Sequence, residues 1–152
     1  MRAPHKQQGF SLAEMLVVVA VLGILAAIAA PNLADMVRKQ RIKTASFDVF
    51  STLNLARSEA IKRNRSVTVR PTSSDWARGW QVSDSAGNVI KEQPGWSDLT
   101  LLGPGQVIFT SNGRVSGSAA QFSLSGRDVA AGDKRCIELD LSGRAVSREG
   151  SC

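Results

Sequence analysis

Apolar residues dominate the start of the chain, where residues 10–33 contain one ionisable side chain, Glu14. About 20 apolar residues are enough for a helix to cross a lipid bilayer, so this stretch predicts a transmembrane helix over residues 10–33. A carboxylate inside the bilayer costs roughly 2.5 to 3.5 kcal/mol on insertion scales, and such an acid is by default functional and paired. A plain membrane anchor does not explain Glu14.

A second helical pattern follows, and it contains no glycine or proline between Pro31 and Pro71. Apolar residues recur there at steps of three and four, which is the spacing of an amphipathic helix. We predict that one helix continues through residues 34–65 and ends near Asn64. Pro31 is expected to kink or locally open it, because proline removes a helical hydrogen bond. The repeating positions are Ile42, Ala45, Val49, Leu53, Ala56 and Ala60, with Phe50 and Ile61 beside them.

After residue 65 the pattern changes to the two-residue alternation of β-strands, separated by clusters of Gly, Pro, Asn, Asp and Ser. Ser142-Gly143 lies between two alternating runs and predicts a tight hairpin. Trp76 and Trp80 are expected in the core rather than on a binding surface. A helix followed by short antiparallel strands is an α+β fold, with a β-rich domain over residues 66–152. Strands are predicted at residues 67–69, 79–82, 88–91, 106–110, 121–124, 136–141 and 144–147.

The composition argues against enzymatic chemistry. The sequence has no tyrosine, and its one histidine is His5, ahead of the apolar stretch. Because no histidine follows His5, a zinc site and His-based acid–base or triad chemistry are disfavoured in the rest of the chain. There is also no Gly-rich phosphate loop and no metal-ligand spacing. We therefore expect no catalytic residues, no metal and no cofactor.

Three interpretations of the first apolar stretch are considered. A secretory signal peptide would use Ala27-Ile28-Ala29 as its cleavage site, but its apolar core would be shorter and would lack an acid. A plain anchor accounts for the length and leaves Glu14 unexplained. The third interpretation is favoured: Gly9-Phe10-Ser11-Leu12-Ala13-Glu14, followed by an apolar helix, resembles the leader and N-terminal helix of type IV pilins and type II secretion pseudopilins.

This resemblance implies a processing pathway for residues 1–9. A prepilin peptidase would cleave between Gly9 and Phe10 and methylate the new amine of Phe10. In a filament, the amine of one subunit would pair with Glu14 of another, and a buried ion pair of this kind can fix the register of packed helices. Glu14 also lies near the helix N-terminus, where the helix dipole favours negative charge.

The resemblance extends beyond the leader. Residues 55–63, then residues 76–80 with Asp84, then residues 107–114 ending in Asn112-Gly113-Arg114, resemble the GspH/FimT family of minor pilins and pseudopilins. The tail, residues 142–152, is similar to that of FimT- and FimU-type minor pilins. The implied function is a minor pilin of a type IV pilus, in assembly priming or a tip complex, with other pilins as partners. The alternative is a pseudopilin of a type II secretion system.

The two cysteines, Cys136 and Cys152, are expected to pair, because disulfides persist in an exported domain. Two free thiols are the alternative. A loop of this length contributes about 3 kcal/mol on the chain-entropy model.

The distribution of charge conflicts with the topology that the resemblance implies. The net charge is +6, and residues 31–70 hold nine bases and three acids. The positive-inside rule alone would place the side after the membrane segment in the cytoplasm. The resemblance implies the reverse: one pass through the bacterial inner membrane, with the C-terminal domain in the periplasm and later in the extracellular pilus.

DNA is a further partner to consider, since some FimT-type minor pilins are associated with DNA uptake through basic residues near the tail. Exposed bases could neutralise phosphates without recognising sequence. Nearby acids, namely Asp133, Glu138, Asp140 and Glu149, nearly cancel the local charge. The candidate residues are Lys134, Arg135, Arg144 and Arg148, with Arg114 and Arg127 as further candidates.

Overall fold

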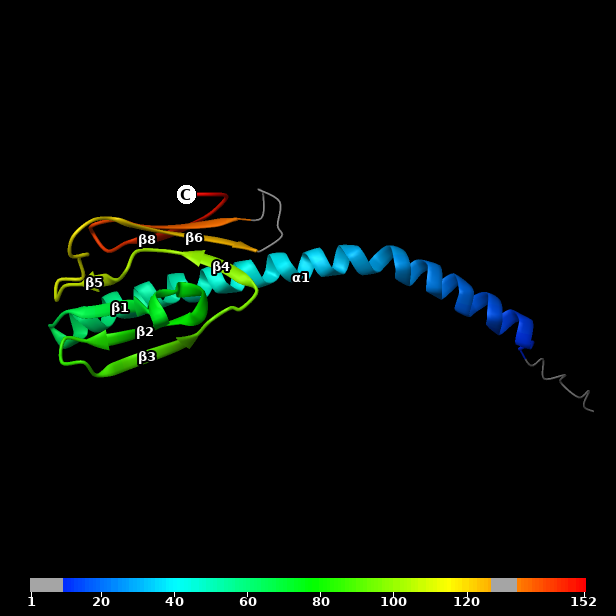
Figure 1. Cartoon of the computed structure of the whole chain (residues 1–152), viewed down its shortest axis with the longest axis horizontal. Helices are drawn as coiled ribbons and strands as arrows, with labels where there is room; N and C mark the ends of the chain where they lie inside the picture. Colours follow the sequence, from blue (N-terminus) through cyan, green and yellow to red (C-terminus); the bar gives the residue numbers. More distant parts are fainter. Residues whose placement is uncertain (1–9, 127–133) are drawn as a thin grey trace, which may run out of the picture. The chain divides into compact units, whose positions relative to one another are not determined.

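The computed structural model describes residues 10–126 and 134–152. The chain divides into two compact units, Met1–Val37 and Arg38–Cys152, which are described separately. One helix, α1 (Leu12–Arg63), passes through both units (Figure 1). It ends one residue before the predicted end. Pro31 lies within α1, and the kink predicted there falls among residues 29–32, whose side chains are outside the described part.

The second half of α1 has the buried face that the apolar spacing predicted. All six repeating positions from Ile42 to Ala60 are exposed by 2% or less. Phe50 is partly buried against the same core, whereas Ile61 is 51% exposed. The three- and four-residue spacing therefore identified the buried stripe, and it failed only at the end of the helix.

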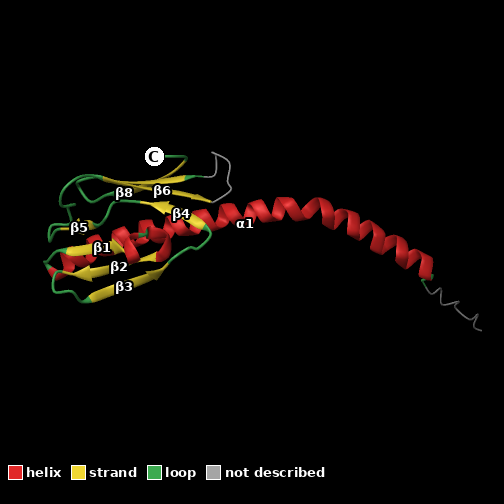
Figure 2. Cartoon of the chain, viewed as in Figure 1, coloured by secondary structure: helices red, strands yellow, loops and turns green. Residues whose placement is uncertain are grey.

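Two four-stranded antiparallel sheets follow α1 in the sequence; Figure 2 shows their strands in yellow. Both sheets contribute residues to one core cluster with the helix. The α+β prediction is confirmed. The first sheet has the order β3-β2-β1-β5, and the second has the order β4-β6-β7-β8. Two 3₁₀ segments, Thr72–Ser74 and Trp76–Arg78, join β1 to β2. The strands are β1 (Val67–Pro71), β2 (Gly79–Asp84), β3 (Val89–Pro94), β4 (Leu99–Leu102), β5 (Val107–Phe109), β6 (Ala120–Gly126), β7 (Arg135–Leu139) and β8 (Ala145–Glu149).

Strand β4 is absent from the sequence prediction. Its burial alternates, with Leu99 and Leu101 buried and Thr100 and Leu102 exposed. The period-two signal was thus present, but it covers four residues and ends at a Gly-Pro pair. Pairing with β6 along four positions makes this short segment a strand.

The tryptophans Trp76 and Trp80 lie in the core, as predicted. The Trp80 indole N–H donates to Thr52 Oγ1 of α1 at 3.2 Å, and the Trp76 indole N–H donates to the carbonyl of Pro104 at 2.7 Å. Trp76 also packs edge-on against Phe122, with 4.9 Å between ring centroids. The indoles of Trp76 and Trp80 therefore each have the hydrogen-bond partner that a buried tryptophan usually finds.

Three turns of the domain share one backbone geometry, in which the first and fifth residues are bonded and the fourth is glycine. In Asp140–Arg144, the N–H of Asp140 donates to the Arg144 carbonyl at 3.1 Å and the N–H of Gly143 donates to the Asp140 carbonyl at 2.9 Å. Gly143 has φ of 81°, a conformation that glycine adopts without steric cost. The predicted hairpin between β7 and β8 thus has a three-residue loop. The other two turns are Asp84–Asn88 and Thr110–Arg114.

These turns are fixed against the C-terminal end of α1. Arg57 Nε donates to the Gly113 carbonyl at 3.1 Å. A Cβ added at Gly143 would lie only 2.1 Å from the Gly113 carbonyl oxygen, so these two turns are in close contact. The side chain of Asp84, which is 3% exposed, lies 3.6 Å from Arg63 Nη1. Hydrogen bonds from Asn88 hold the pKa of Asp84 below its ordinary value.

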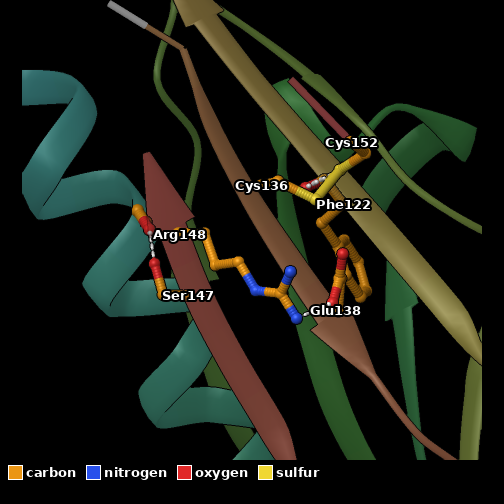
Figure 3. Close-up of a disulfide and its surroundings, with 7 residues drawn as sticks. Phe122, Cys136, Glu138, Ser147, Arg148 and Cys152 are labelled. Carbon is orange, nitrogen blue, oxygen red and sulfur yellow. Dashed lines mark hydrogen bonds and ion pairs between the residues drawn. A yellow bond between two sulfur atoms is a disulfide. The ribbon is translucent and has the colours of Figure 1, made fainter. Parts of the chain in front are cut away.

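The C-terminal tail folds back over β7. The N–H of Gly150 donates to the carbonyl of Lys134 at 2.7 Å. Cys136 and Cys152 form a disulfide with 5.0 Å between their Cα atoms, in agreement with the sequence prediction (Figure 3). The Cys152 sulfur lies 3.2 Å from the carbonyl oxygen of Phe122, so the tail reaches β6.

Gly143→Ala should destabilise the domain more than Gly87→Ala does. Both glycines have positive φ, where an L side chain costs about 1 to 2 kcal/mol. At Gly143 the added Cβ also meets the Gly113 carbonyl, whereas nothing lies within 4 Å of a Cβ at Gly87. Urea unfolding of residues 38–152 measures both variants, and equal losses of unfolding free energy would contradict the packing described here.

Cys152→Ser is expected to lower the unfolding free energy by about 3 kcal/mol, because the disulfide no longer restricts the unfolded chain. Guanidinium unfolding with and without a reductant measures the effect. The reductant should destabilise the native sequence and leave the Cys152→Ser variant unchanged. A native protein insensitive to complete reduction would refute the prediction.

Candidate functional site

The N-terminal end of α1 is capped by the residue before it. The backbone N–H of Glu14 lies 3.2 Å from Ser11 Oγ and 3.1 Å from the Ser11 carbonyl. A serine at this position satisfies an N–H that the helix itself leaves unbonded. Glu14 is the acid of the first turn, where the helix dipole stabilises negative charge.

The first half of α1 exposes its apolar side chains on all sides. Its large apolar residues from Phe10 to Val37 are between 45% and 79% exposed. The helix is long and apolar enough to cross a membrane. An apolar surface of this extent indicates a bilayer or packed neighbouring helices around it.

Glu14 stands alone within this apolar surface. Among residues 10–126 and 134–152, no ion pair or hydrogen bond involves its carboxylate. Phe10 is described and exposed, whereas Gly9 and the rest of the predicted leader lie outside the described residues.

Three of the four arginine and lysine candidates for DNA binding are paired with acids. Arg135 contacts Glu149 at 2.7 Å. Arg148 contacts Glu138 at 2.7 Å, as Figure 3 shows. Arg144 Nε lies 3.7 Å from Asp140 Oδ2 within the β7–β8 turn. A hydrogen bond from Ser142 keeps the pKa of Asp140 below its ordinary value, so this acid stays ionised beside Arg144.

The structure does not gather these candidates into one patch. Arg148 pairs in register with Cys136, so its side chain and that of Arg135 are on opposite faces of the sheet. Arg144 lies at the other end of the hairpin, beyond Ala145. Lys134 directly precedes β7, and Arg127 is outside the described residues. Within the described ranges, no group of three or more His, Cys, Asp or Glu side chains is placed to hold a metal ion.

Sequence reasoning missed one surface feature, a groove of about 440 Å³ beside strand β8. Phe47 lines it and is 66% exposed. The signal was present in the sequence, because Phe47 is a large apolar residue outside the three- and four-residue steps of the buried stripe. The ion pairs across β7 and β8 were also missed, since they depend on strand register.

Comparison with known families gives two matches. Residues 46–143 match the family model of the type II transport protein GspH. Residues 4–30 match the prokaryotic N-terminal methylation motif, which covers the predicted cleavage point and Glu14.

Relatives of known name include a fimbrial protein of Pseudomonas aeruginosa. It is 38% identical over 132 residues, which cover 78% of this chain and 76% of that protein. The type II secretion system core protein G of Pectobacterium carotovorum subsp. carotovorum is 28% identical over 111 residues, covering 67% of this chain and 70% of that protein.

Two solved structures share the fold. The type IV minor pilin FimU of Pseudomonas aeruginosa (strain PAO1) superposes with a TM-score of 0.64 at 20% identity, covering 72% of this chain and 89% of FimU. The minor pseudopilin EpsH of the Vibrio cholerae type 2 secretion system superposes with a TM-score of 0.57 at 15% identity, covering 71% of this chain and 96% of EpsH. The chain therefore belongs to the GspH family of pilin-like filament subunits, as a minor pilin or pseudopilin with an N-terminal methylation motif.

Proposed function

We propose that this protein is a minor pilin of a type IV pilus, cleaved between Gly9 and Phe10 by a prepilin peptidase and methylated at Phe10. It then joins the filament through Glu14, in the complex that primes assembly or forms the tip. The observation that carries this proposal is Glu14, an acid without a described partner on a helix whose apolar side chains are exposed on all sides.

Cleavage between Gly9 and Phe10 would create a positive charge that can pair with the Glu14 carboxylate. The new amine at Phe10 is cationic at neutral pH and lies four residues, about one helical turn, before Glu14. In a bundle of packed subunits, the amine of one chain and Glu14 of its neighbour would neutralise one another within an apolar environment. Because a buried charge without a partner is strongly destabilising, this pairing favours one register of the helices.

Two comparisons support the pilus over the secretion system. The fimbrial relative is 38% identical over 132 residues, against 28% over 111 residues for the secretion protein. The FimU structure also superposes with a higher TM-score than EpsH. A GspH-like pseudopilin of a type II secretion system is the alternative, and the neighbouring genes distinguish the two.

We infer that the C-terminal domain lies in the periplasm before assembly and outside the cell in the pilus. The Cys136–Cys152 disulfide supports this orientation, because disulfides persist in oxidising compartments. The basic residues that follow the apolar helix, including Arg38 and Lys39, argue for the opposite orientation under the positive-inside rule. We give the disulfide more weight, because large domains are translocated across the membrane largely regardless of the basic residues beside the membrane helix.

DNA binding by the tail, which the sequence resemblance suggests, is left out of the proposed function because the geometry lends it little support. Arg135, Arg144 and Arg148 each have an acidic neighbour, and they lie on different faces and ends of the β7–β8 hairpin. A phosphate backbone would have to compete with these acids for each guanidinium group. Non-specific binding also requires several cations in one track along the nucleic acid.

Glu14→Ala should leave the protein in the membrane fraction and remove it from the filaments, because the helix stays apolar while the amine of its neighbour loses its partner. Immunoblots of membranes and of sheared filaments measure the two pools. Glu92→Ala, which changes an exposed acid of β3, serves as the control and should assemble normally. A normal amount of the Glu14→Ala protein in filaments would refute the proposed role.

A gel shift of residues 38–152 with duplex DNA at two salt concentrations tests the DNA prediction. We expect no salt-sensitive shift at micromolar protein, because the candidate arginines are already paired. A shift that weakens with salt and is lost in the Arg144→Ala/Arg148→Ala variant would establish DNA binding instead.

A further inference from the structure

Strand β8 and the second half of α1 border an open groove of about 440 Å³ within the unit Arg38–Cys152. The helix and strand meet at Ser46 and Ser147, whose hydroxyl oxygens are 2.9 Å apart. Figure 3 shows Ser147 on β8 facing the helix. The lining includes Lys43, Phe47 and Phe50 of α1, Arg135 of β7, and Ala145 and Val146 of β8.

Strand β8 presents an open hydrogen-bonding edge along this groove. It is the last strand in the order β4-β6-β7-β8, so among the described strands it has a neighbour on one side only. Backbone bonds join Asp140 to Arg144 and Gly150 to Lys134. Because bonded pairs alternate along an antiparallel ladder, the N–H and C=O groups of Ala145, Ser147 and Glu149 point away from β7.

The other described sheet edges are protected against strand addition. The pairing of β2 with β3 is interrupted by a bulge at Val82/Ser83, and β3 ends at Pro94. Strands β4 and β5 have four and three residues. Bulges, proline and short length all hinder edge pairing. Strand β8, by contrast, keeps an unbroken register with β7 over five residues.

The groove is lined by basic and apolar side chains, and this composition indicates what kind of segment can bind there. Lys43 and Arg135 are the ionisable residues of the lining, and the lining contains no acid. Arg135 is paired with Glu149, whereas the Lys43 ammonium has no ion pair or hydrogen bond among the described residues. The apolar rings of Phe47 and Phe50 lie beside this cation. A complementary segment therefore carries an apolar side chain next to a carboxylate.

We propose that an extended segment of a different subunit of the same filament adds to β8 as a fifth strand of its sheet. The segment bonds to the outward backbone groups of β8, packs an apolar side chain against Phe47 and Phe50, and pairs a carboxylate with Lys43. Strand addition of this kind takes its affinity from the main chain and its specificity from alternate side chains. The inference rests on the proposed function, because a filament supplies the neighbouring subunits.

Photo-crosslinking of the full-length chain tests this docking. A benzoylphenylalanine in place of Phe47 is introduced in cells that assemble filaments, and sheared filaments are irradiated and analysed by mass spectrometry. The expected product is one adduct with another subunit, mapped to an extended segment that contains an acid. The control places the same group at Ile61, an apolar residue of α1 that is 51% exposed and lies outside the groove.

Two substitutions at Ser147 separate strand addition from simple proximity. Ser147→Pro removes an outward N–H that the β7 ladder does not use, and the adduct yield should fall roughly fivefold, as expected for the loss of one hydrogen bond. Ser147→Ala removes the hydroxyl contact with Ser46 and keeps the N–H, so its adduct yield should stay unchanged. Thermal unfolding reports whether both variants remain folded. Should Ser147→Pro unfold, Lys43→Glu, at an exposed position, replaces it and should lower the yield by a similar factor.

Several results would overturn the docking proposal: a Phe47 adduct no more abundant than the Ile61 adduct, an adduct with a second copy of this chain or with a protein outside the filament, or a yield unaffected by the variants. Absence of the native chain from filaments would instead refute the proposed function. A chain that is present in filaments but gives no Phe47 adduct refutes the docking alone.

Discussion

The buried face of α1 between Ile42 and Ala60 is the constraint on which the rest of the domain depends. Residues of both sheets join it in one core cluster. Alanines at positions 45, 56 and 60 leave room on the helix surface, and Leu53 and Val49 fill the space between them. Since protein interiors are close-packed, the helix surface sets where the strands can lie. The glycine turns at the end of α1 then hold the sheets in place through Arg57 and Arg63.

The same helix explains why the protein needs other molecules to function. Its first half exposes apolar residues on all sides, and Glu14, the one acid of residues 10–33, has no partner in the described chain. Bilayer lipid can cover the apolar residues before assembly, and neighbouring helices can cover them afterwards. Neither environment solvates a carboxylate well, so a cation from another subunit is the natural partner. Under the proposed function, Glu14 is one half of an ion pair that assembly of the filament completes.

The outer part of the domain follows a different physical rule, in which charge is balanced within the chain. Arg135 of β7 is paired with Glu149, which lies directly opposite it on β8. Arg148 of β8 is paired with Glu138, two positions along β7 from its register partner Cys136. The disulfide ties the last residue to the middle of the sheet. Most of the basic side chains near the tail are therefore already in ion pairs with acids of the same chain. Lys43, at the groove beside β8, is an exception among the described residues, and there the apolar rings of Phe47 and Phe50 lie open to a partner.

Local patterns in the sequence determined the membrane-length helix, the buried stripe of α1, most strands, the cysteine pair and the motif around Glu14. Each of these depends on neighbours in the sequence or on composition, which a single chain displays directly. Tertiary structure decided the short strand β4, the pairing of Arg148 with Glu138, the packing of Gly143 on Gly113, and the groove at Phe47. These features join residues that are distant in the sequence, and strand register and close packing exist only once the sheets have formed.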